Sequence, residues 1–177
     1  MLTTALLVTA GFAGAATRDN APLNDAGLER NILHEIRMYP NYSIWDDINF
    51  RVRDGQVELS GAVNQPYKKS DIERIVHSVP GVTSVTDQIK VLPLSNFDDR
   101  LRIQVARAIY SDPVLSRYAM QPLAPIHVIV DNGHVTLTGV VNNEMEKNVA
   151  GIRANGAGLS FGSVTNNLVV ENPARKS

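Results

Sequence analysis

The feature that most constrains this chain is an internal repeat. Residues 48–61 and 126–139 agree in apolar or polar class at every position except one, where Arg51 stands against Ile129, at an offset of 78 residues. Upstream, the apolar positions repeat at an offset of 73, and downstream residues 84–86 repeat as residues 163–165 at an offset of 79. Such self-similarity indicates two copies of one structural unit, with the changes of offset placed in loops.

Each copy is predicted to begin with a helix and a β-hairpin. The apolar positions of the first helix have helical spacing, and they are Leu28, Ile32, Leu33 and Ile36 in copy one and Leu101, Val105, Ala108 and Ile109 in copy two. Alternating residues then flank Asp54-Gly55 or Asn132-Gly133, which tolerate the positive φ angles of a type I′ turn. Pairing outward from the first turn places Val52 opposite Val57, so each hairpin has one apolar face.

A second helix and a last strand complete each copy. In copy one the helix opens at Pro66 and stops before Pro80-Gly81. In copy two the expected apolar stripe is Met145, Val149 and Ile152. We therefore expect an α+β fold of two tandem αββαβ modules, each with two helices packed on a small three-stranded mixed sheet. Five glycines have a structural role in this prediction, with Gly61 and Gly139 letting a helix approach the sheet: Gly55, Gly61, Gly81, Gly133 and Gly139.

Composition excludes several classes of protein. The chain has no cysteine, which excludes disulfides, zinc–thiolate sites and thiol catalysis. Its 17 basic and 18 acidic residues give a net charge of -1, which argues against binding of nucleic acid through bulk positive charge.

The amino terminus resembles an export signal. Residues 2–16 are uncharged, small and apolar, too short for a spanning helix, and end in the small-x-small pattern Ala13-Gly14-Ala15. We therefore expect a periplasmic protein. The expected organisation is a signal peptide over residues 1–16, a linker over 17–24, a first module over 25–92, a linker over 93–96, a second module over 97–172 and a tail over 173–177.

The doubled pattern Gly-x-Val-x-Leu-x-Gly-x-Val resembles the BON domain of bacterial exported and envelope proteins. It runs from Gly55 to Val63 and again from Gly133 to Val141, and the segment Val79-Pro80-Gly81-Val82 supports it. In copy two, residues 157–162 replace the usual Pro-Gly-Val. The tandem arrangement is similar to that of two-BON periplasmic proteins related to OsmY. The resemblance implies association with phospholipid or other envelope components and a role in osmotic stress, and it carries over no lipid-contact residue.

No catalytic or metal-binding constellation is evident. His127 and His134 lie four residue pairs apart on one predicted hairpin face, about 13 Å, which is too far for one ion. No Gly-x-Ser-x-Gly motif and no phosphate-cradling loop are present. We therefore expect neither enzymatic activity nor a metal or other cofactor.

Candidate contact residues lie mainly in the loop after each first helix. Aromatic side chains in such loops suit a membrane interface; the alternative is that they fold back over the sheet edge or fill the interface between the two copies. Lys68 and Lys69 form a small basic cluster on the second helix, either a solvated face or a contact for lipid headgroups. Ile129 is apolar on an otherwise polar sheet face, which fits an inter-domain or partner contact. The candidates for lipid or partner contact are Tyr42, Trp45, Lys68, Lys69, Tyr118, Met120, Leu123 and Ile129.

Two functions follow as hypotheses. The first is a periplasmic module that binds a phospholipid surface peripherally and supports envelope integrity or osmotic-stress tolerance. The alternative is a protein–protein interaction or chaperone-like module that contacts envelope proteins through exposed sheet edges without binding lipid. The oligomeric state is left open by the sequence.

Overall fold

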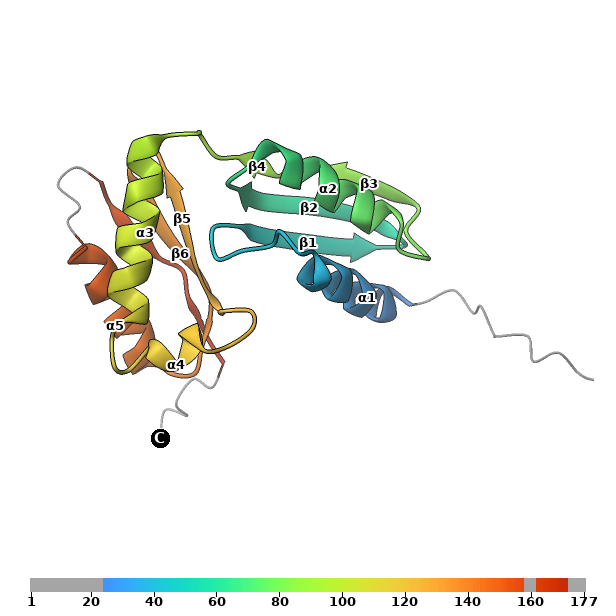
Figure 1. Cartoon of the computed structure of the whole chain (residues 1–177). Helices are drawn as coiled ribbons and strands as arrows, with labels where there is room; N and C mark the ends of the chain where they lie inside the picture. The colour runs from blue at the N-terminus through green and yellow to red at the C-terminus, as the bar shows by residue number, and fades with distance from the viewer. Residues whose placement is uncertain (1–23, 158–161, 172–177) are drawn as a thin grey trace, which may run out of the picture.

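The computed structural model describes residues 24–157 and 162–171, which form two αββαβ domains in tandem (Figure 1). The elements of domain 1 are α1 (Asp25–Met38), β1 (Asp47–Arg53), β2 (Gln56–Val63), α2 (Pro66–His77), β3 (Ser84–Asp87) and β4 (Lys90–Val91). The elements of domain 2 are α3 (Asn96–Tyr110), α4 (Ser116–Ala119), β5 (Ile126–Asp131), β6 (His134–Val141), α5 (Glu144–Asn155), β7 (Val164–Asn166) and β8 (Val169–Val170). The predicted α+β class and the doubled module are confirmed, and the last strand of each module is split in two.

Each sheet is mixed, as predicted. The hairpin β1–β2 is antiparallel, and β3 and β4 both pair with β2 in parallel. Domain 2 repeats this order with β5–β6 and with β7 and β8 beside β6. The predicted register is correct, because Val52 pairs with Val57 and Val130 with Val135. Positive φ angles at Asp54 and Asn132 fit the predicted turn chemistry.

A carboxylate in the first turn of each first helix binds the hairpin turn of its own domain. Asp98 accepts hydrogen bonds from the backbone amides of Asn132, at 3.0 Å, and Gly133, at 2.9 Å. Asp25 accepts from the corresponding amides in domain 1, at 3.1 and 3.4 Å. The helix is thereby held against the sheet at a defined position along the hairpin.

Gly61 and Gly139 have a different role from the one predicted. Their φ angles are +109° and +105°, and a Cβ atom would lie 2.0 Å from the carbonyl oxygen of Asp47 or 1.9 Å from that of Pro125. The close approach is therefore made by the backbone leading into the neighbouring strand, and not by a helix. Positive φ angles also occur at the other predicted structural glycines, Gly55, Gly81 and Gly133.

The helix α5 corrects a second prediction. Its buried face is formed by Glu146, Ala150, Gly151 and Ala154. Met145 and Ile152, which were expected to face the core, are exposed. Small residues let α5 lie close to α3 and the sheet, so Met145 and Ile152 point to solvent, whereas Val149 packs against the core as predicted.

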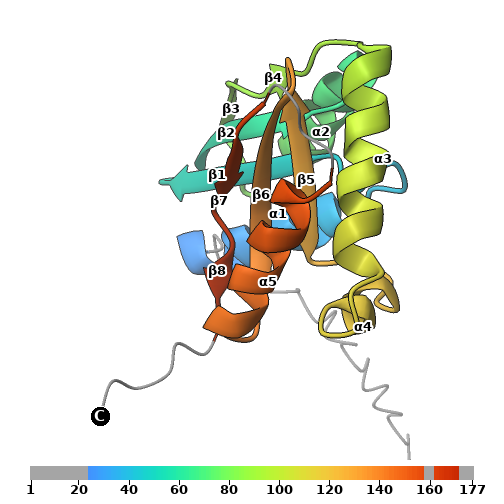
Figure 2. The same cartoon turned by 90° about the vertical axis from the view of Figure 1, so that its left-hand side faces the viewer.

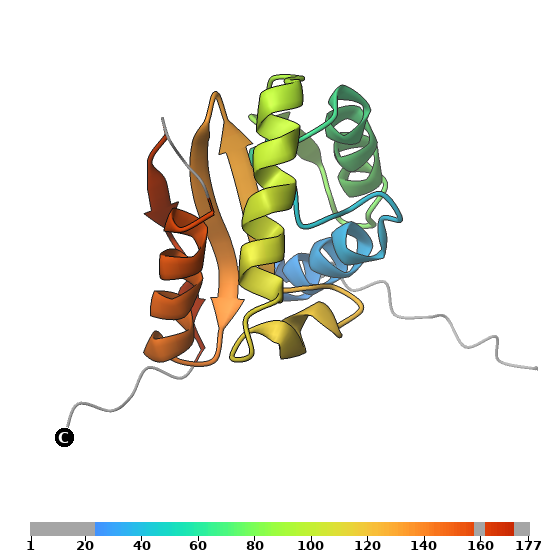
Figure 3. The same ribbon diagram turned by 60° about the vertical axis from the view of Figure 1, so that its left-hand side comes forward.

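The two domains lie against each other. Figures 1 and 2 show that α3 and α5 cover one face of the domain 2 sheet and that domain 1 lies on the opposite side. Figure 3 shows α3 running alongside β5, with α4 beyond its C-terminal end. Each domain has its own core, centred on Ile32 and Leu59 in domain 1 and on Val105 and Leu137 in domain 2.

Candidate functional site

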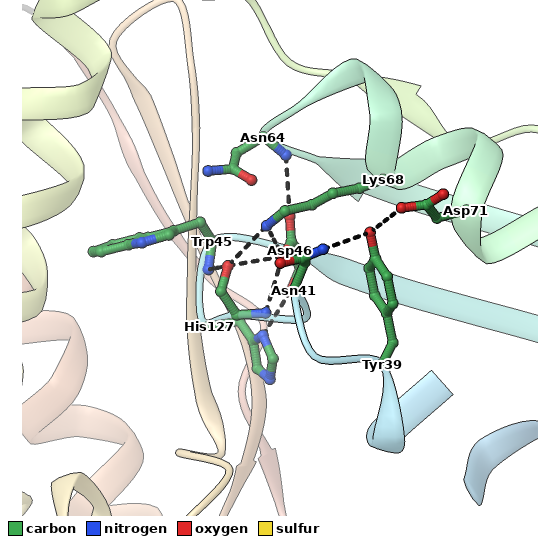
Figure 4. A network of polar contacts seen from close by, with 9 residues as sticks. Tyr39, Asn41, Trp45, Asp46, Asn64, Lys68, Asp71 and His127 are labelled. Carbon is green, nitrogen blue, oxygen red and sulfur yellow. Dashed lines mark hydrogen bonds and ion pairs between the residues drawn. The ribbon is translucent and has the colours of Figure 1, made fainter. Parts of the chain in front are cut away.

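The loop between α1 and β1 of domain 1 makes non-covalent contacts with domain 2 (Figure 4). The carbonyl of Ile44 accepts a hydrogen bond from the amide of Val128, at 2.7 Å, on the edge of β5. Ile44 and Trp45 pack against the core of domain 2. The ring of His127 bonds through Nδ1 to the carbonyl oxygen of Asp46 at 2.6 Å. The loop therefore extends the edge of the second sheet and inserts an aromatic side chain beside it.

A buried ion pair fixes this loop. The Lys68 ammonium lies 2.6 Å from the Asp46 carboxylate, and the two side chains are only 5% and 0% exposed. Asp46 also accepts hydrogen bonds from the amide and hydroxyl of Ser43 and from the amide of Asn64. A buried carboxylate with a cation and three donors is fully satisfied, which holds the loop in one conformation.

Domain 2 has a similar buried carboxylate, but there the second helix carries the acidic residue, where domain 1 has the basic residue Lys68. Glu146, which stands at the position of Lys68 in the repeat, is buried and accepts hydrogen bonds from the amide of Asn142, at 3.0 Å, and from the hydroxyl of Tyr118. Arg117 forms its ion pair. In both domains a buried carboxylate thus binds the amide just before the second helix. The loop supplies it in domain 1 and the helix supplies it in domain 2.

Burial shifts the pKa values of two side chains at the junction between the domains. It lowers the pKa of His127 below the usual value of a histidine, against the opposing effects of the Asp46 carbonyl and of the nearby carboxylates. The ring is therefore neutral at pH 7 and donates its Nδ1 proton to the Asp46 carbonyl. Tyr42 lies beside it, with 5.5 Å between ring centroids, and burial raises its pKa to about 12.

Three of the predicted contact residues are buried and face neither lipid nor solvent. Lys68 is paired with Asp46, which corrects both its interpretation as a solvated residue and its interpretation as a headgroup contact. Tyr118 bonds Glu146 inside domain 2. Ile129 lies between His127 and Asp131 on the outer sheet face, and both neighbours bind domain 1, Asp131 through an ion pair with Lys90. Its burial therefore fits the inter-domain contact.

The other five predicted residues differ in exposure. Tyr42 and Trp45 are half-buried at the junction, which fits the inter-domain alternative better than the membrane alternative. Lys69 is half-exposed and donates to the carbonyl of Ile89 at 2.8 Å. Met120, at 86% exposed, and Leu123, at 44%, remain open to solvent in the loop after α4.

A cleft of about 530 Å³ lies between the domains. Its apolar walls come from Leu33 of α1 and Phe50 of β1 on one side and from Leu123 and Val140 of domain 2 on the other. His127 and Arg37 add polar groups to the lining. The cleft is open and carries no pair of groups arranged for acid–base or nucleophilic chemistry.

The outer face of α3 carries exposed apolar and basic side chains that are not among the predicted contact residues. Phe97 is 52% exposed and Ile103 is 45% exposed, and the exposed side chains Arg100 and Arg107 lie on the same side of the helix. Neither arginine forms an ion pair with another residue in the part of the chain that the structure describes. The signal was present in the helical spacing, opposite the buried stripe of Leu101, Val105 and Ile109.

Within residues 24–157 and 162–171, no three or more His, Cys, Asp or Glu side chains are grouped to hold a metal ion. Over the same ranges, no helix has the length and apolar character needed to cross a membrane.

Comparison with models of protein families identifies the family to which the chain belongs. The BON domain model matches residues 24–93 and again residues 98–172, so the chain belongs to the BON domain family and carries the domain twice. Tandem BON domains indicate a non-enzymatic, envelope-associated protein. A comparison with curated protein sequences finds no match.

Two solved structures are similar to the chain at low identity. One comes from structural studies of CdsD, a structural protein of the type III secretion system of Chlamydia trachomatis. It is 21% identical, with 84% of this chain and 93% of that chain covered and a TM-score of 0.29. The other is the C-terminal domain of CdsD, which is 18% identical, with 85% and 100% covered and a TM-score of 0.30.

Proposed function

We propose that this protein is a periplasmic, peripheral membrane-binding protein that associates with anionic phospholipid through the outer face of α3 and so supports envelope integrity under osmotic stress. The observation that carries the proposal is the joint exposure of Phe97, Ile103, Arg100 and Arg107 on one helix face. Export rests on residues 1–16, which lie outside the described residues, and on the BON family's place in exported proteins.

The chemistry of this face suits a membrane interface. An interfacial helix inserts apolar side chains among the headgroups while basic side chains bind anionic lipid. Because Leu101, Val105 and Ile109 fix the other side of α3 in the core, the backbone of the exposed face is already ordered before binding, and only side-chain freedom is lost.

Electrostatic attraction to anionic lipid must come from the arginines on this helix face, because the whole chain carries a net charge of only -1. A basic side chain close to an anionic membrane contributes about 1 kcal/mol to binding. Removing both arginines should therefore weaken membrane binding by about 2 kcal/mol, or about thirty-fold. The effect should fall as salt screens the surface potential.

Flotation with vesicles tests the proposal. The protein should float with vesicles that contain phosphatidylglycerol and remain at the bottom with pure phosphatidylcholine. The Arg100→Gln/Arg107→Gln variant and the Phe97→Ser/Ile103→Ser variant should both lose flotation.

The matched control is Met145→Ser/Ile152→Ser, which removes from the outer face of α5 two apolar side chains that are at least as exposed. If the α5 variant loses flotation and the α3 variants retain it, the assigned surface is wrong. If the unmodified protein never floats, the ligand is wrong. N-terminal sequencing of the periplasmic form tests export separately, since retention of Leu2 would contradict it.

A further inference from the structure

The two first strands of the repeat have the same backbone geometry at their outer edges. In each hairpin, alternate residues of the first strand bond the second strand, and the residues between them direct their amide and carbonyl groups outward. The outward residues are Ile126, Val128 and Val130 in β5 and, at the repeat offset, Ile48, Phe50 and Val52 in β1.

The edge of β5 is closed. Tyr110 donates its hydroxyl to the carbonyl of Ile126 at 2.6 Å, and Arg102 donates to the carbonyl of Val130 at 2.8 Å. Burial raises the pKa of Tyr110 to about 12, so its hydroxyl remains a donor. The amide of Val128, between them, is taken by Ile44 of domain 1. Ile126, Val128 and Val130 are all 0% exposed, so this edge is not accessible to a further strand.

The edge of β1 is open. The positions of Arg102, Ala106 and Tyr110 are occupied in α1 by Glu29, Leu33 and Arg37, at the offset of 73. A glutamate cannot donate to a carbonyl, and Leu33 is 40% exposed where Ala106 is buried. Among the described residues, none makes a hydrogen bond to the outward backbone groups of Ile48, Phe50 or Val52.

A groove runs along this open edge between α1 and β1. One hollow, of about 480 Å³, is lined by Glu29 of α1 and by residues 50–53 of β1, and it extends across Gln56 and Glu58 of β2 to Thr86 of β3. The inter-domain cleft continues it, with Leu33 and Ile36 of α1 facing Ile48 and Phe50. The two hollows share Phe50 and together follow β1 along its length.

From this groove we infer that domain 1 binds an extended peptide segment, which pairs with β1 as an added strand. An unpaired strand edge beside a helix offers backbone hydrogen bonds for affinity and pockets for alternate side chains. This inference does not depend on the membrane contact, because α3 and β1 lie in different domains.

The side chains along β1 define the chemistry of the segment. On the side of β1 that faces α1, Leu33, Ile48, Phe50 and Val52 offer contacts to apolar residues. On the outer face, the exposed Arg51 and Arg53 would lie beside alternate residues of the added strand. Glu58 faces Arg51 from β2, whereas Arg53 faces the uncharged Gln56. The segment therefore alternates apolar residues with carboxylates at the end near Arg53.

At the edge of β1, a second copy of the domain fits less well than a single extended strand. Adjacent strands lie about 4.8 Å apart, whereas packed helices need about 8–10 Å between their axes. Pairing β1 with β1 of another molecule would bring two α1 helices, each over its own edge strand, closer than that distance.

A synthetic peptide tests the inference. The probe is a labelled, capped peptide of sequence Thr-Val-Glu-Val-Glu-Val-Thr, titrated with the full chain by fluorescence anisotropy. Amide hydrogen exchange should show new protection at Phe50 and Val52 on binding. The same peptide with alternate backbone nitrogens methylated should bind at least ten-fold more weakly, because it cannot complete the strand pairing.

Two variants address the groove and the charges. Glu29→Arg/Arg37→Tyr introduces into α1 the residues that close β5, and it should lower affinity at least ten-fold. Arg51→Glu/Arg53→Glu should lower affinity for this peptide and raise it for the peptide with lysine in place of glutamate. Arg100→Gln/Arg107→Gln, which alters the membrane face, should bind the peptide unchanged.

The inference is overturned if β1 gains no protection, or if the closing variant binds as well as the original protein. It is also overturned if sedimentation shows a dimer with protected β1 amides in the absence of peptide, since the occupant would then be a second copy. Loss of vesicle flotation with retained peptide binding would contradict only the membrane proposal.

Discussion

The buried pair between Lys68 and Asp46 gives the sharpest prediction, through the substitution Lys68→Met. Methionine keeps most of the aliphatic stem and removes the ammonium group, so packing is largely preserved. Removing one partner of a buried ion pair costs about 3–5 kcal/mol, because the other charge stays buried without compensation. Three hydrogen bonds to Asp46, from Ser43 and Asn64, remain. We therefore expect a loss near the lower limit, about 3 kcal/mol.

Urea denaturation measures this loss with two probes. Far-ultraviolet circular dichroism reports on the whole chain, and the fluorescence of Trp45, the single tryptophan of the sequence, reports on the inter-domain junction. The Trp45 transition should move to lower urea by more than the overall transition, because Asp46 sits in the same loop as Trp45.

The neighbouring Lys69→Met is the matched control. Lys69 is half-exposed, with the Ile89 carbonyl at 2.8 Å and the Asp87 carboxylate at 3.8 Å. A contact of this kind is worth about 1 kcal/mol. If Lys68→Met costs no more than Lys69→Met, the assignment of Lys68 as the residue that fixes the loop is refuted.

Two further predictions concern pH and backbone geometry. Because burial lowers the folded pKa of His127 below the unfolded value of about 6.5, the unfolded state binds more protons below that pH, and stability falls as pH drops from about 6.5 towards the folded pKa. His127→Gln should flatten this dependence in urea titrations at several pH values, and an unchanged slope would contradict the assignment. Gly139→Ala should cost more than about 3 kcal/mol, since a Cβ atom would lie 1.9 Å from the Pro125 carbonyl at a φ of +105°. Gly156→Ala, at an ordinary φ of -78°, should cost less than about 1 kcal/mol by thermal unfolding, and equal losses would show that the backbone constraint is not at Gly139.

The hairpins were predictable because their signals are local. The turn pairs Asp54-Gly55 and Asn132-Gly133 fix the register, and a period of two then fixes which residues share a face. The stripe of α5 was not predictable in the same way. Its buried face is made of alanine, glycine and one glutamate, and a pattern based on large apolar residues therefore selected Met145 and Ile152, which are exposed.

The roles of the charged residues also required the folded chain. Lys68 and Glu146 lie on helices, yet both are buried: Lys68 pairs with Asp46 of the loop after α1, and Glu146 bonds Tyr118 of α4. Sequence spacing cannot bring together Asp46 and Lys68, because their meeting depends on where the loop turns after α1.

The sequence by itself determined the two αββαβ modules, their register and their family, because periodicity, turn residues and the repeat act over short stretches of chain. Only the tertiary structure decided which candidate residues reach solvent. The packing of domain 1 against the outer face of the second sheet buried Ile129 and half-buried Tyr42 and Trp45. The same packing helped to close the edge of β5, while substitutions on α1 left the edge of β1 open. Exposure depends on which surfaces meet, and that is a property of the assembled chain.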